Sequence, residues 1–326
     1  LVHTKTPSPR ACVKLCETPA GKHCLAIWSP IFDALVLGLT YSFGSYSVRG
    51  KMEQATSSLL NTIRSSAPWP EFIESGLNAL YDAVPHSEGL IVDGGELGHD
   101  GSPLLAGIPI SKKTVRILNN KSCVNVFSPQ LRSSLCLAYH LNGEGQQSAT
   151  IPTHAFDDAR FTQLSSSQMR SGKWQPRPLV HPVLLQAEFG QTGCNESMLS
   201  TQLSPMRAEF ADGLWQALTE ELFAHYPKRF GELWVYVGPI YNRDSLILSS
   251  GLKVPSAYYA IAFDLTETGG LRAIAFMVPN DAGNNQLENY ISSIGSIEQA
   301  TGMNFMPDIE FDARETLRTW QSPRLW

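Results

Sequence analysis

Two groups of residues have side chains of the types that bind metal ions. The first brings Cys12 and Cys16 together with His3 and His23 near the start of the chain. Thiolate and imidazole groups are the ligands of structural zinc sites, but the spacing of these four residues does not match a zinc-binding pattern. We therefore interpret this group as an accidental cluster rather than a metal site.

The second group combines His154 with Asp157 and Asp158, side chains that suit a divalent cation. It lies in the polar segment 142–180, which contains three prolines and is predicted to be mainly loop. Asp residues in such a stretch are typical of turns. The sequence therefore contains no strong metal motif, and the elements that position a site have to be predicted first.

The composition predicts a chain with a large apolar core. Of its 326 residues 43% are hydrophobic and 17% are charged, which excludes a disordered or collagen-like protein. Residues 1–51 contain six basic and two acidic residues, a net charge of +4, whereas the other 275 residues contain 19 basic and 28 acidic ones, a net charge of −9. This balance argues against a globally basic surface for nucleic acid but leaves a local basic groove open.

Residues 24–48 are apolar enough to be considered as a membrane anchor. They contain one charged residue, Asp33, and are long enough to cross a bilayer once. The flank on the N-terminal side is the more basic one, so the positive-inside rule predicts an exported, periplasmic or extracellular body. We expect an anchor without a cleavage site. Because Pro30 and Asp33 suit a membrane helix poorly, the alternative is a buried helix of a soluble protein.

Three segments are predicted along the chain. Residues 1–50 form the basic tail with the membrane anchor. Apolar residues recur at helical spacing in 51–65 and 70–84, and a Gly-rich linker follows, so residues 51–103 are predicted to be a helical stalk and linker. Residues 104–326 are predicted to fold as one domain.

Beyond residue 104, short runs rich in β-branched and aromatic residues predict strands. Three of the later runs are apolar almost throughout, as in strands that are buried on both faces of a sheet. The predicted strands are 114–118, 123–127, 135–141, 233–240, 258–265 and 271–279. Helices are predicted at 207–224 and at 286–301, the latter ending at Gly302. The predicted fold class is α+β, with a central antiparallel sheet flanked by helices.

Cys123 and Cys136 flank a predicted hairpin. In an exported protein they could form a disulfide across it, whereas two buried free thiols agree at least equally well with the sequence. Both alternatives stay open at the level of the sequence.

Several stretches, taken in order, resemble the DNA/RNA non-specific endonucleases, which are ββα-metal nucleases. The resemblance extends over about residues 105–318. The segments that carry it are AGIPI (106–110), STQLSPM (200–206), EFADGLW (209–215), LWVYVGPIY (233–241), KVPSAYYAIAFD (253–264), AFMVPN (275–280) and YISSIGSIEQATGMNF (290–305). The resemblance implies a ββα-metal nuclease-like domain, metal-dependent hydrolysis of phosphodiesters in DNA or RNA, a Mg²⁺ or Mn²⁺ cofactor, and a homodimer.

The resemblance also implies a general base. In the family a histidine in an Asp-Arg-Gly-His motif activates water, and a neutral imidazole accepts such a proton near pH 7. The motif is missing from this chain, where the corresponding region reads WQPRPLVHPVLLQAEFG (174–190). A gapless alignment places Pro178 near the histidine position, and a shift of three residues brings His181 there instead. His181 is therefore the candidate general base.

The family holds its magnesium ion through an asparagine in a Phe-Asn-x-Gly-x-Trp pattern. Here the pattern reads Phe-Ala-Asp-Gly-Leu-Trp, so Ala211 occupies the asparagine position and offers no ligand. Asp212 and Glu209 are the candidate replacement ligands, although neighbouring helix positions point about 100° apart. Gln202 stands where the family has another asparagine. Arg207, at the start of the predicted helix, is the candidate contact to a substrate phosphate.

Three functional interpretations follow. The first is a membrane-anchored, metal-dependent endonuclease with a divergent site around His181. The second is a catalytically inactive pseudo-nuclease that serves as a binding or structural module, which Ala211 and the acidic body favour. The third is an unrelated hydrolase that uses Glu209, Asp212 and His181 in the same cleft.

Overall fold

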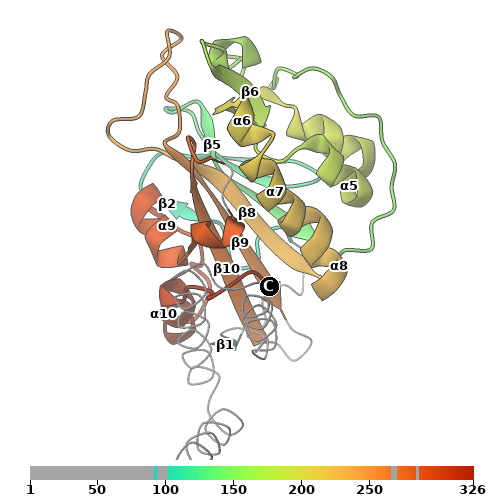
Figure 1. Ribbon diagram of the computed structural model, residues 1–326, viewed down its shortest axis with the longest axis vertical. Helices are drawn as coiled ribbons and strands as arrows, with labels where there is room; N and C mark the ends of the chain where they lie inside the picture. Colours follow the sequence, from blue (N-terminus) through green and yellow to red (C-terminus); the bar gives the residue numbers. More distant parts are fainter. Residues whose placement is uncertain (1–91, 94–101, 266–269, 284–285) are drawn as a thin grey trace, which may run out of the picture. The chain divides into compact units, whose positions relative to one another are not determined.

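The computed structural model describes residues 92–93, 102–265, 270–283 and 286–326 (Figure 1). The chain divides into two compact units, Leu1–Ser87 and Glu88–Trp326, and all described residues lie in the second unit. The predicted anchor at 24–48 and the predicted helices at 51–65 and 70–84 lie outside the described residues.

The second unit is built on one antiparallel sheet. Its strands follow the order β1-β10-β9-β8-β5-β4-β3, and β11 pairs with a different part of β10 than β1 does. The strands are β1 (Val92–Asp93), β3 (Arg116–Asn119), β4 (Val124–Ser128), β5 (Ser133–Leu141), β8 (Leu233–Ile240), β9 (Ala257–Leu265), β10 (Gly270–Pro279) and β11 (Ile291–Ser292). All six predicted strands are confirmed, and so is the α+β fold class. Strand β1 lies within the segment predicted to be the linker.

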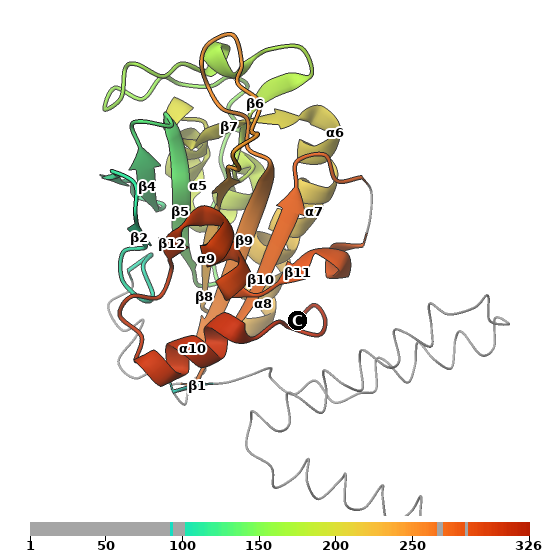
Figure 2. The same ribbon diagram turned by 90° about the vertical axis from the view of Figure 1, so that its left-hand side faces the viewer.

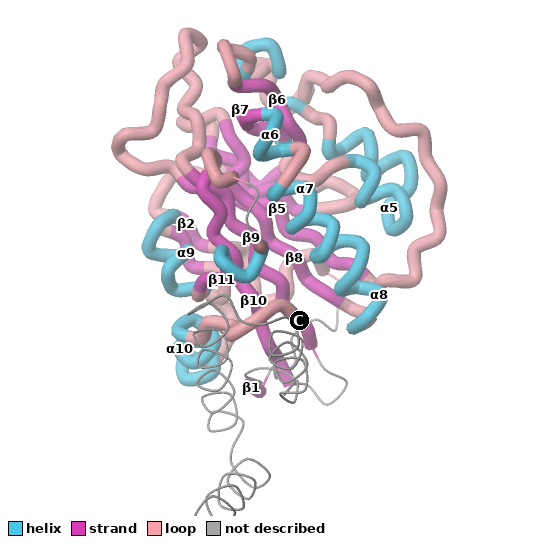
Figure 3. The backbone as a smooth tube through the Cα atoms, in the orientation of Figure 1, coloured by secondary structure: helices cyan, strands magenta, loops and turns pink. Residues whose placement is uncertain are grey.

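Helices cover both faces of the sheet, which explains why its central strands are apolar throughout. Figure 3 shows α5 (Pro182–Ser197), α7 (Leu214–Glu220) and α8 (Tyr226–Phe230) on one side, and α9 (Ile294–Thr301) and α10 (Phe311–Thr319) on the other. In β5, Leu137 and Tyr139 pack toward the first group, whereas Ala138 packs toward the second. Within the described ranges, no helix combines the length and the apolarity needed to cross a membrane.

Cys123 and Cys136 belong to different cores. Strands β4 and β5 pair so that Val126 lies opposite Cys136, and both pack with α9, whereas Cys123 packs on the face that carries α5 to α8. Both residues are buried free thiols, and burial raises the pKa of Cys123 to about 11 and that of Cys136 to about 12. Of the two alternatives, free thiols are therefore confirmed, because side chains on opposite faces of a sheet cannot form a disulfide.

The segment 142–180 is mainly loop, as predicted, but two short elements interrupt it. It contains the 3₁₀ turn η1 (Ser166–Met169) and strand β6 (Trp174–Pro178), which pairs with β7 (Leu203–Arg207). Both strands contain proline, so the sequence pattern does not predict them. A two-stranded ribbon tolerates proline because each strand has an edge without a pairing partner. A second short ribbon pairs β2 (Ile110–Ser111) with β12 (Met303–Asn304).

The predicted helix 207–224 is divided by a sharp bend. Helix α6 (Ala208–Ala211) ends before Gly213, whose ψ of −107° is not helical, and α7 begins directly after it. A Cβ atom at Gly213 would lie 2.6 Å from the carbonyl oxygen of Glu209, so only glycine permits this bend. The helix then continues beyond residue 224 through a π-helical turn, η3 (Glu221–His225), into α8.

The predicted helix 286–301 is shorter than expected. Helix α9 begins after Ser293, whose side chain accepts a hydrogen bond from the Ser296 N–H, and it ends as predicted at Gly302, which has a left-handed φ of 72°. The residues before it form a 3₁₀ turn, η4 (Leu287–Tyr290), and β11, because β10 offers them a pairing edge. Helices α5 and α10 are not evident from the sequence pattern; in α5 the non-helical Gly190 interrupts the apolar period.

Candidate functional site

Strands β6 and β7 and helices α6 and α7 form a ββα unit at the end of the sheet opposite to β1 and α10 (Figures 1 and 2). The register pairs Trp174 with Arg207 and Pro178 with Leu203. The indole N–H of Trp215 in α7 donates to the carbonyl oxygen of Leu179 over 2.9 Å, which ties the helix to the segment after β6. This segment leads directly into His181 and α5.

Aromatic packing holds the ββα unit on the sheet. The ring of Trp215 lies 5.9 Å from that of Phe210 and 5.4 Å from that of Tyr258 in β9. The Tyr258 hydroxyl in turn lies 2.9 Å from the Ser204 hydroxyl and donates to the carbonyl oxygen of Pro205 over 3.1 Å. The position of the unit is therefore set by buried contacts rather than by its surface residues.

His181 is exposed and forms the N-cap of α5. Its Nδ1 atom accepts a hydrogen bond from the backbone N–H of Val183 over 3.3 Å. This bond assigns the proton of the neutral ring to Nε2. Desolvation of the ring by the residues packed beside it lowers the pKa of His181, Asp212 raises it by less than that, and Arg177 lowers it again, so that the pKa lies below its usual 6.5. His181 is thus neutral at pH 7, but its basic nitrogen is already engaged in the helix cap.

We expect the titration of His181 to respond to its two charged neighbours in opposite directions. Asp212→Asn removes a negative charge and lowers the pKa of His181 further, whereas Arg177→Gln removes a positive charge and raises it. Imidazole ¹H–¹⁵N NMR spectra recorded against pH measure both shifts. The signals of the exposed His154 serve as an internal control and should be the same in both variants. Shifts of the same sign would show that these charges do not act on the ring.

Arg177 and Asp212 form an ion pair beside this histidine. Nη2 of Arg177 donates to Oδ2 of Asp212 over 2.8 Å, with 33% and 56% of the two side chains exposed. The pair joins β6 to the end of α6. The structure therefore brings together His181, Arg177 and Asp212. Glu209, in the first turn of α6, is exposed and makes no ion pair or hydrogen bond through its side chain with a described residue.

The Arg207 side chain projects from the face of the β6–β7 ribbon that is opposite to the Arg177 side chain. Side chains alternate along a strand, and Arg207 lies three residues beyond Ser204, the partner of Arg177, so it projects away from Arg177. Its guanidinium carbon lies 5.4 Å from the centre of the Trp174 ring. The predicted phosphate contact and the predicted base are thus on different faces of the ββα unit.

The residues around Ala211 do not fit the metal ion that the family resemblance implies. Ala211 has no donor atom, and the neighbouring carboxylate of Asp212 is paired with Arg177, whose positive charge opposes a cation at this position. Among the described residues, no group of three or more His, Cys, Asp or Glu side chains is arranged to hold a metal ion. We therefore derive no reaction step through a metal.

Two buried amides near the unit each have a side-chain atom without a hydrogen-bond partner among the described residues, and only Gln202 of the two was singled out by the sequence. Asn280, directly after β10, is 3% exposed and donates to the carbonyl oxygens of Pro255 and Pro205, over 3.0 and 3.4 Å. Its Oδ1 has no partner among the described residues, and neither has Nε2 of the buried Gln202. No local signal identifies Asn280, because its partners are distant in the sequence.

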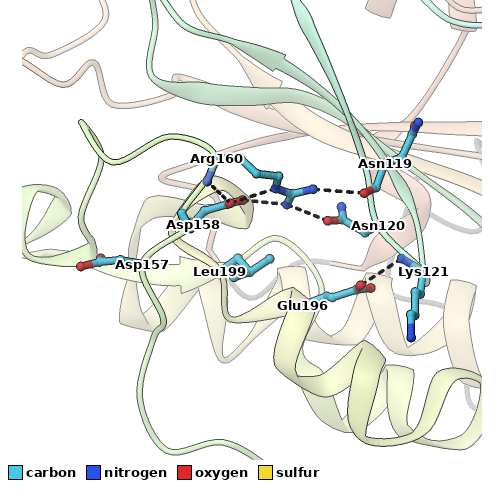
Figure 4. A pocket seen from close by; sticks show the side chains of 9 residues that line it. Asn119, Asn120, Lys121, Asp157, Asp158, Arg160, Glu196 and Leu199 are labelled. Atoms are coloured by element: carbon cyan, nitrogen blue, oxygen red, sulfur yellow. Dashed lines mark hydrogen bonds and ion pairs between the residues drawn. The ribbon is translucent and has the colours of Figure 1, made fainter.

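A polar pocket of about 560 Å³ lies elsewhere, where α5 ends (Figure 4). It is lined by Asn119, Asn120, Lys121, Asp157, Asp158, Ala159, Arg160, Glu196 and Leu199. Arg160 donates to Asp158, to Asn120 and to the carbonyl oxygen of Asn119, while Glu196 accepts from the backbone N–H groups of Lys121 and Ser122. Asp158 and Arg160 thus bind each other, and the contacts of Glu196 with backbone N–H groups fasten the β3–β4 turn to α5.

Asp158 is the centre of this network. The carboxylate accepts from the N–H of Arg160 over 3.0 Å, which makes the turn predicted for this segment, and from the Thr201 hydroxyl over 2.6 Å. Burial raises the pKa of Asp158, but the hydrogen bonds from Arg160 and Thr201 outweigh it and hold the pKa below the usual 3.8. The ionised carboxylate therefore stabilises the fold.

We expect Asp158→Asn to lower the free energy of unfolding at pH 7 by about 1 to 3 kcal/mol, since it weakens charge-assisted hydrogen bonds of a buried group. The contribution of the carboxylate is present above the unfolded pKa of 3.8 and is lost as the pH falls through the lower folded value, so the two proteins converge in acid. Urea denaturation across pH measures this difference. Asp157→Asn, at the exposed neighbour, is the control. Equal stability of Asp158→Asn and wild type at pH 7 would contradict the assignment.

Comparison with known proteins identifies one family. A search of curated proteins found no match to this chain. The family model of the DNA/RNA non-specific endonucleases matches residues 186–311, from α5 to the start of α10. The match begins beyond His181 and includes both β7 and the α6–α7 bend. The family model and the ββα unit on its antiparallel sheet thus agree that residues 186–311 are similar to the DNA/RNA non-specific endonucleases.

Proposed function

We propose that this domain binds nucleic acid on a nuclease scaffold and does not cleave it by the metal-dependent route of the family. The observation that carries the proposal is the ion pair between Arg177 and Asp212 beside Ala211. The pair puts the Arg177 guanidinium where a hydrated metal ion would need an oxygen ligand. The nearest carboxylate, that of Asp212, is already bound to this guanidinium. Loss of a single ligand is severe in a site of this kind, because magnesium is held by few protein atoms.

The hydrogen bond and the tautomer of the His181 ring support the same proposal. A general base needs a free lone pair that faces the water it activates. The lone pair of His181 accepts the N–H of Val183, and the other ring nitrogen carries the proton. To act as a base, the ring would have to leave the helix cap or exchange its tautomer.

The second candidate function is metal-dependent phosphodiester hydrolysis with His181 as base. The observation in its favour is that His181 is neutral near pH 7 and lies within electrostatic reach of Asp212. In this alternative Mg²⁺ or Mn²⁺ is the cofactor, and Asp212 and Glu209 are its candidate ligands.

One experiment separates the two candidates. The full chain is mixed with fluorescent DNA and RNA in EDTA to measure binding, and with plasmid DNA and structured RNA in Mg²⁺ or Mn²⁺ to measure cleavage. We expect binding in EDTA and no cleavage above that of a mock preparation. Metal-dependent cleavage that His181→Ala abolishes and His154→Ala leaves intact would establish the second candidate instead. Absence of binding would overturn the proposal.

Membrane anchorage and dimer formation remain predictions from the sequence. We propose that residues 24–48 anchor an exported body, because they combine low charge with a more basic N-terminal flank. Fractionation of the intact chain and of a chain that starts at Lys51 tests the anchor, and recovery of both in the soluble fraction would argue against it. Light scattering of the shorter chain tests the homodimer.

A further inference from the structure

A tryptophan lies at the end of the β6–β7 ribbon, next to a hydrogen-bonded turn. The backbone N–H and C=O groups of Ser171 and Trp174 bond each other reciprocally, over 3.1 and 3.0 Å, across a tight turn. Gly172 in this turn has a φ of 56°, a conformation that favours glycine. The half-buried Trp174 ring packs partly on an apolar cluster that includes Phe161, Leu164 and Met169. The rest of the ring is accessible.

Two cations lie over this ring. Nζ of Lys173 and the guanidinium carbon of Arg207 each lie 5.4 Å from its centre. Arg207 makes no ion pair or hydrogen bond through its side chain with any residue that the structure describes, and its buried Nε has no partner there. A guanidinium without an acceptor is a strong donor for a ligand oxygen, above all for one of a phosphate.

The surroundings of the ribbon tip differ in charge from the acidic body. Residues 161–187 contain Arg170 and Lys173 but no Asp or Glu, while Arg177 is paired with Asp212 on the other face of the ribbon. With Arg207 added from the paired strand, this end of the ribbon is a local basic surface around an aromatic ring. It is the kind of local groove that the overall negative charge left open.

We propose that Trp174, Lys173 and Arg207 form a binding site for single-stranded nucleic acid. A base stacks on the indole, and the adjacent phosphates contact the two cations. Unpaired bases expose their faces, whereas the bases of a duplex are stacked on one another, so the site selects single strands. This inference rests on the proposed nucleic-acid binding and adds the class of ligand and the residues that select it.

Fluorescence anisotropy of the full chain in EDTA tests the site. The probes are single strands of about 16 nucleotides and the corresponding duplex. Trp174→Leu keeps an apolar side chain on the core but removes the π-face, and we expect it to weaken single-strand binding by about 5-fold to 150-fold. Trp174→Phe retains most of the affinity. Arg207→Gln lowers the affinity and reduces the slope of log K against log salt by about 1.

Trp320, a half-buried tryptophan after α10, provides the matched control, and Trp320→Leu is expected to leave binding unchanged. Cross-linking of an iodouridine-containing strand to the wild-type chain, followed by mass spectrometry, locates the contact without any substitution. We expect the cross-link at Trp174. Cross-links elsewhere only, equal affinity for single strand and duplex, or wild-type affinity of folded Trp174→Leu would overturn the site.

The outcomes also separate this site from the broader proposal. If the wild type binds both strands and duplex and Trp174→Leu changes neither, nucleic-acid binding stands and the Trp174 site falls. If the chain binds no nucleic acid, both fall. Competition by polyglutamate as strong as by oligonucleotide would indicate an acidic peptide as the ligand of this surface, and would overturn the assignment to nucleic acid.

Discussion

Arg272→Ala is expected to lower the free energy of unfolding by about 3 to 5 kcal/mol, the cost of breaking a buried ion pair by removing one partner. Arg272 in β10 lies directly opposite Asp264 in β9, and its Nε donates to Oδ2 of Asp264 over 2.6 Å. Both residues are buried. The guanidinium also lies 4.6 Å from the centre of the Phe230 ring and 5.0 Å from that of Trp326, so its removal opens an aromatic cluster as well.

Urea denaturation followed by circular dichroism measures this loss. Arg243→Ala, in the exposed loop after β8, is the matched control, and we expect a change of less than about 0.5 kcal/mol. The double variant Arg272→Leu with Asp264→Leu should recover part of the stability, because an apolar pair avoids the cost of a buried unpaired charge. A loss below about 1 kcal/mol in Arg272→Ala would show that the pair does not stabilise the sheet.

Trp215→Ala is the second substitution for which we expect a large effect, again about 3 to 5 kcal/mol, because it leaves a cavity in the core. The ring is 2% exposed and packs between Phe210 and Tyr258. Trp215→Phe keeps most of this packing but removes the N–H that bonds the Leu179 carbonyl oxygen. We expect it to cost about 1 to 3 kcal/mol, the price of an unpaired buried acceptor.

Trp215→Phe should also change the signals of His181, because Leu179 leads directly into that residue. Trp234→Phe is the matched control. Its indole N–H donates over the same 2.9 Å to a carbonyl oxygen, that of Ser102, from the other core of the domain. Both variants should lose similar stability, but only Trp215→Phe should shift the imidazole resonances of His181. Equal spectra of His181 in the two variants would contradict the role of Trp215 in positioning it.

The central strands were predictable because a strand that is buried on both faces of a sheet has apolar residues at nearly every position. In β8 every residue is buried, so the run 233–240 shows both ends of the strand. Strand β6 has no such apolar run, since it is only partly buried and contains Pro176 and Pro178. The amphipathic period of the helix 207–224 was correct, but that period cannot show the bend at Gly213, which depends on the contact with Glu209.

The sequence could not show which of the candidate site residues lie close together in space. The residue types of His181, Asp212 and Arg207 suggested one cluster, and the family pattern predicted that Ala211 stands at the metal position. The ion pair of Asp212 joins residues 35 positions apart, and Arg207 turns away to Trp174 because of the strand register. Neither the ion pair nor the contact of Arg207 with Trp174 can be recognised from residues that are adjacent in the sequence.

By itself the sequence determined the class of this fold and its central strands, because burial leaves a pattern of apolar residues along the chain, and it predicted that Ala211 offers no metal ligand. Only the tertiary structure decided which side chains meet. The pairing of β6 with β7 and the bend at Gly213 placed His181 with Arg177 and Asp212, and placed Arg207 with Trp174. Contacts of this kind depend on register and on backbone geometry between distant segments, and a change of one residue in register sends every side chain of a strand to the other face.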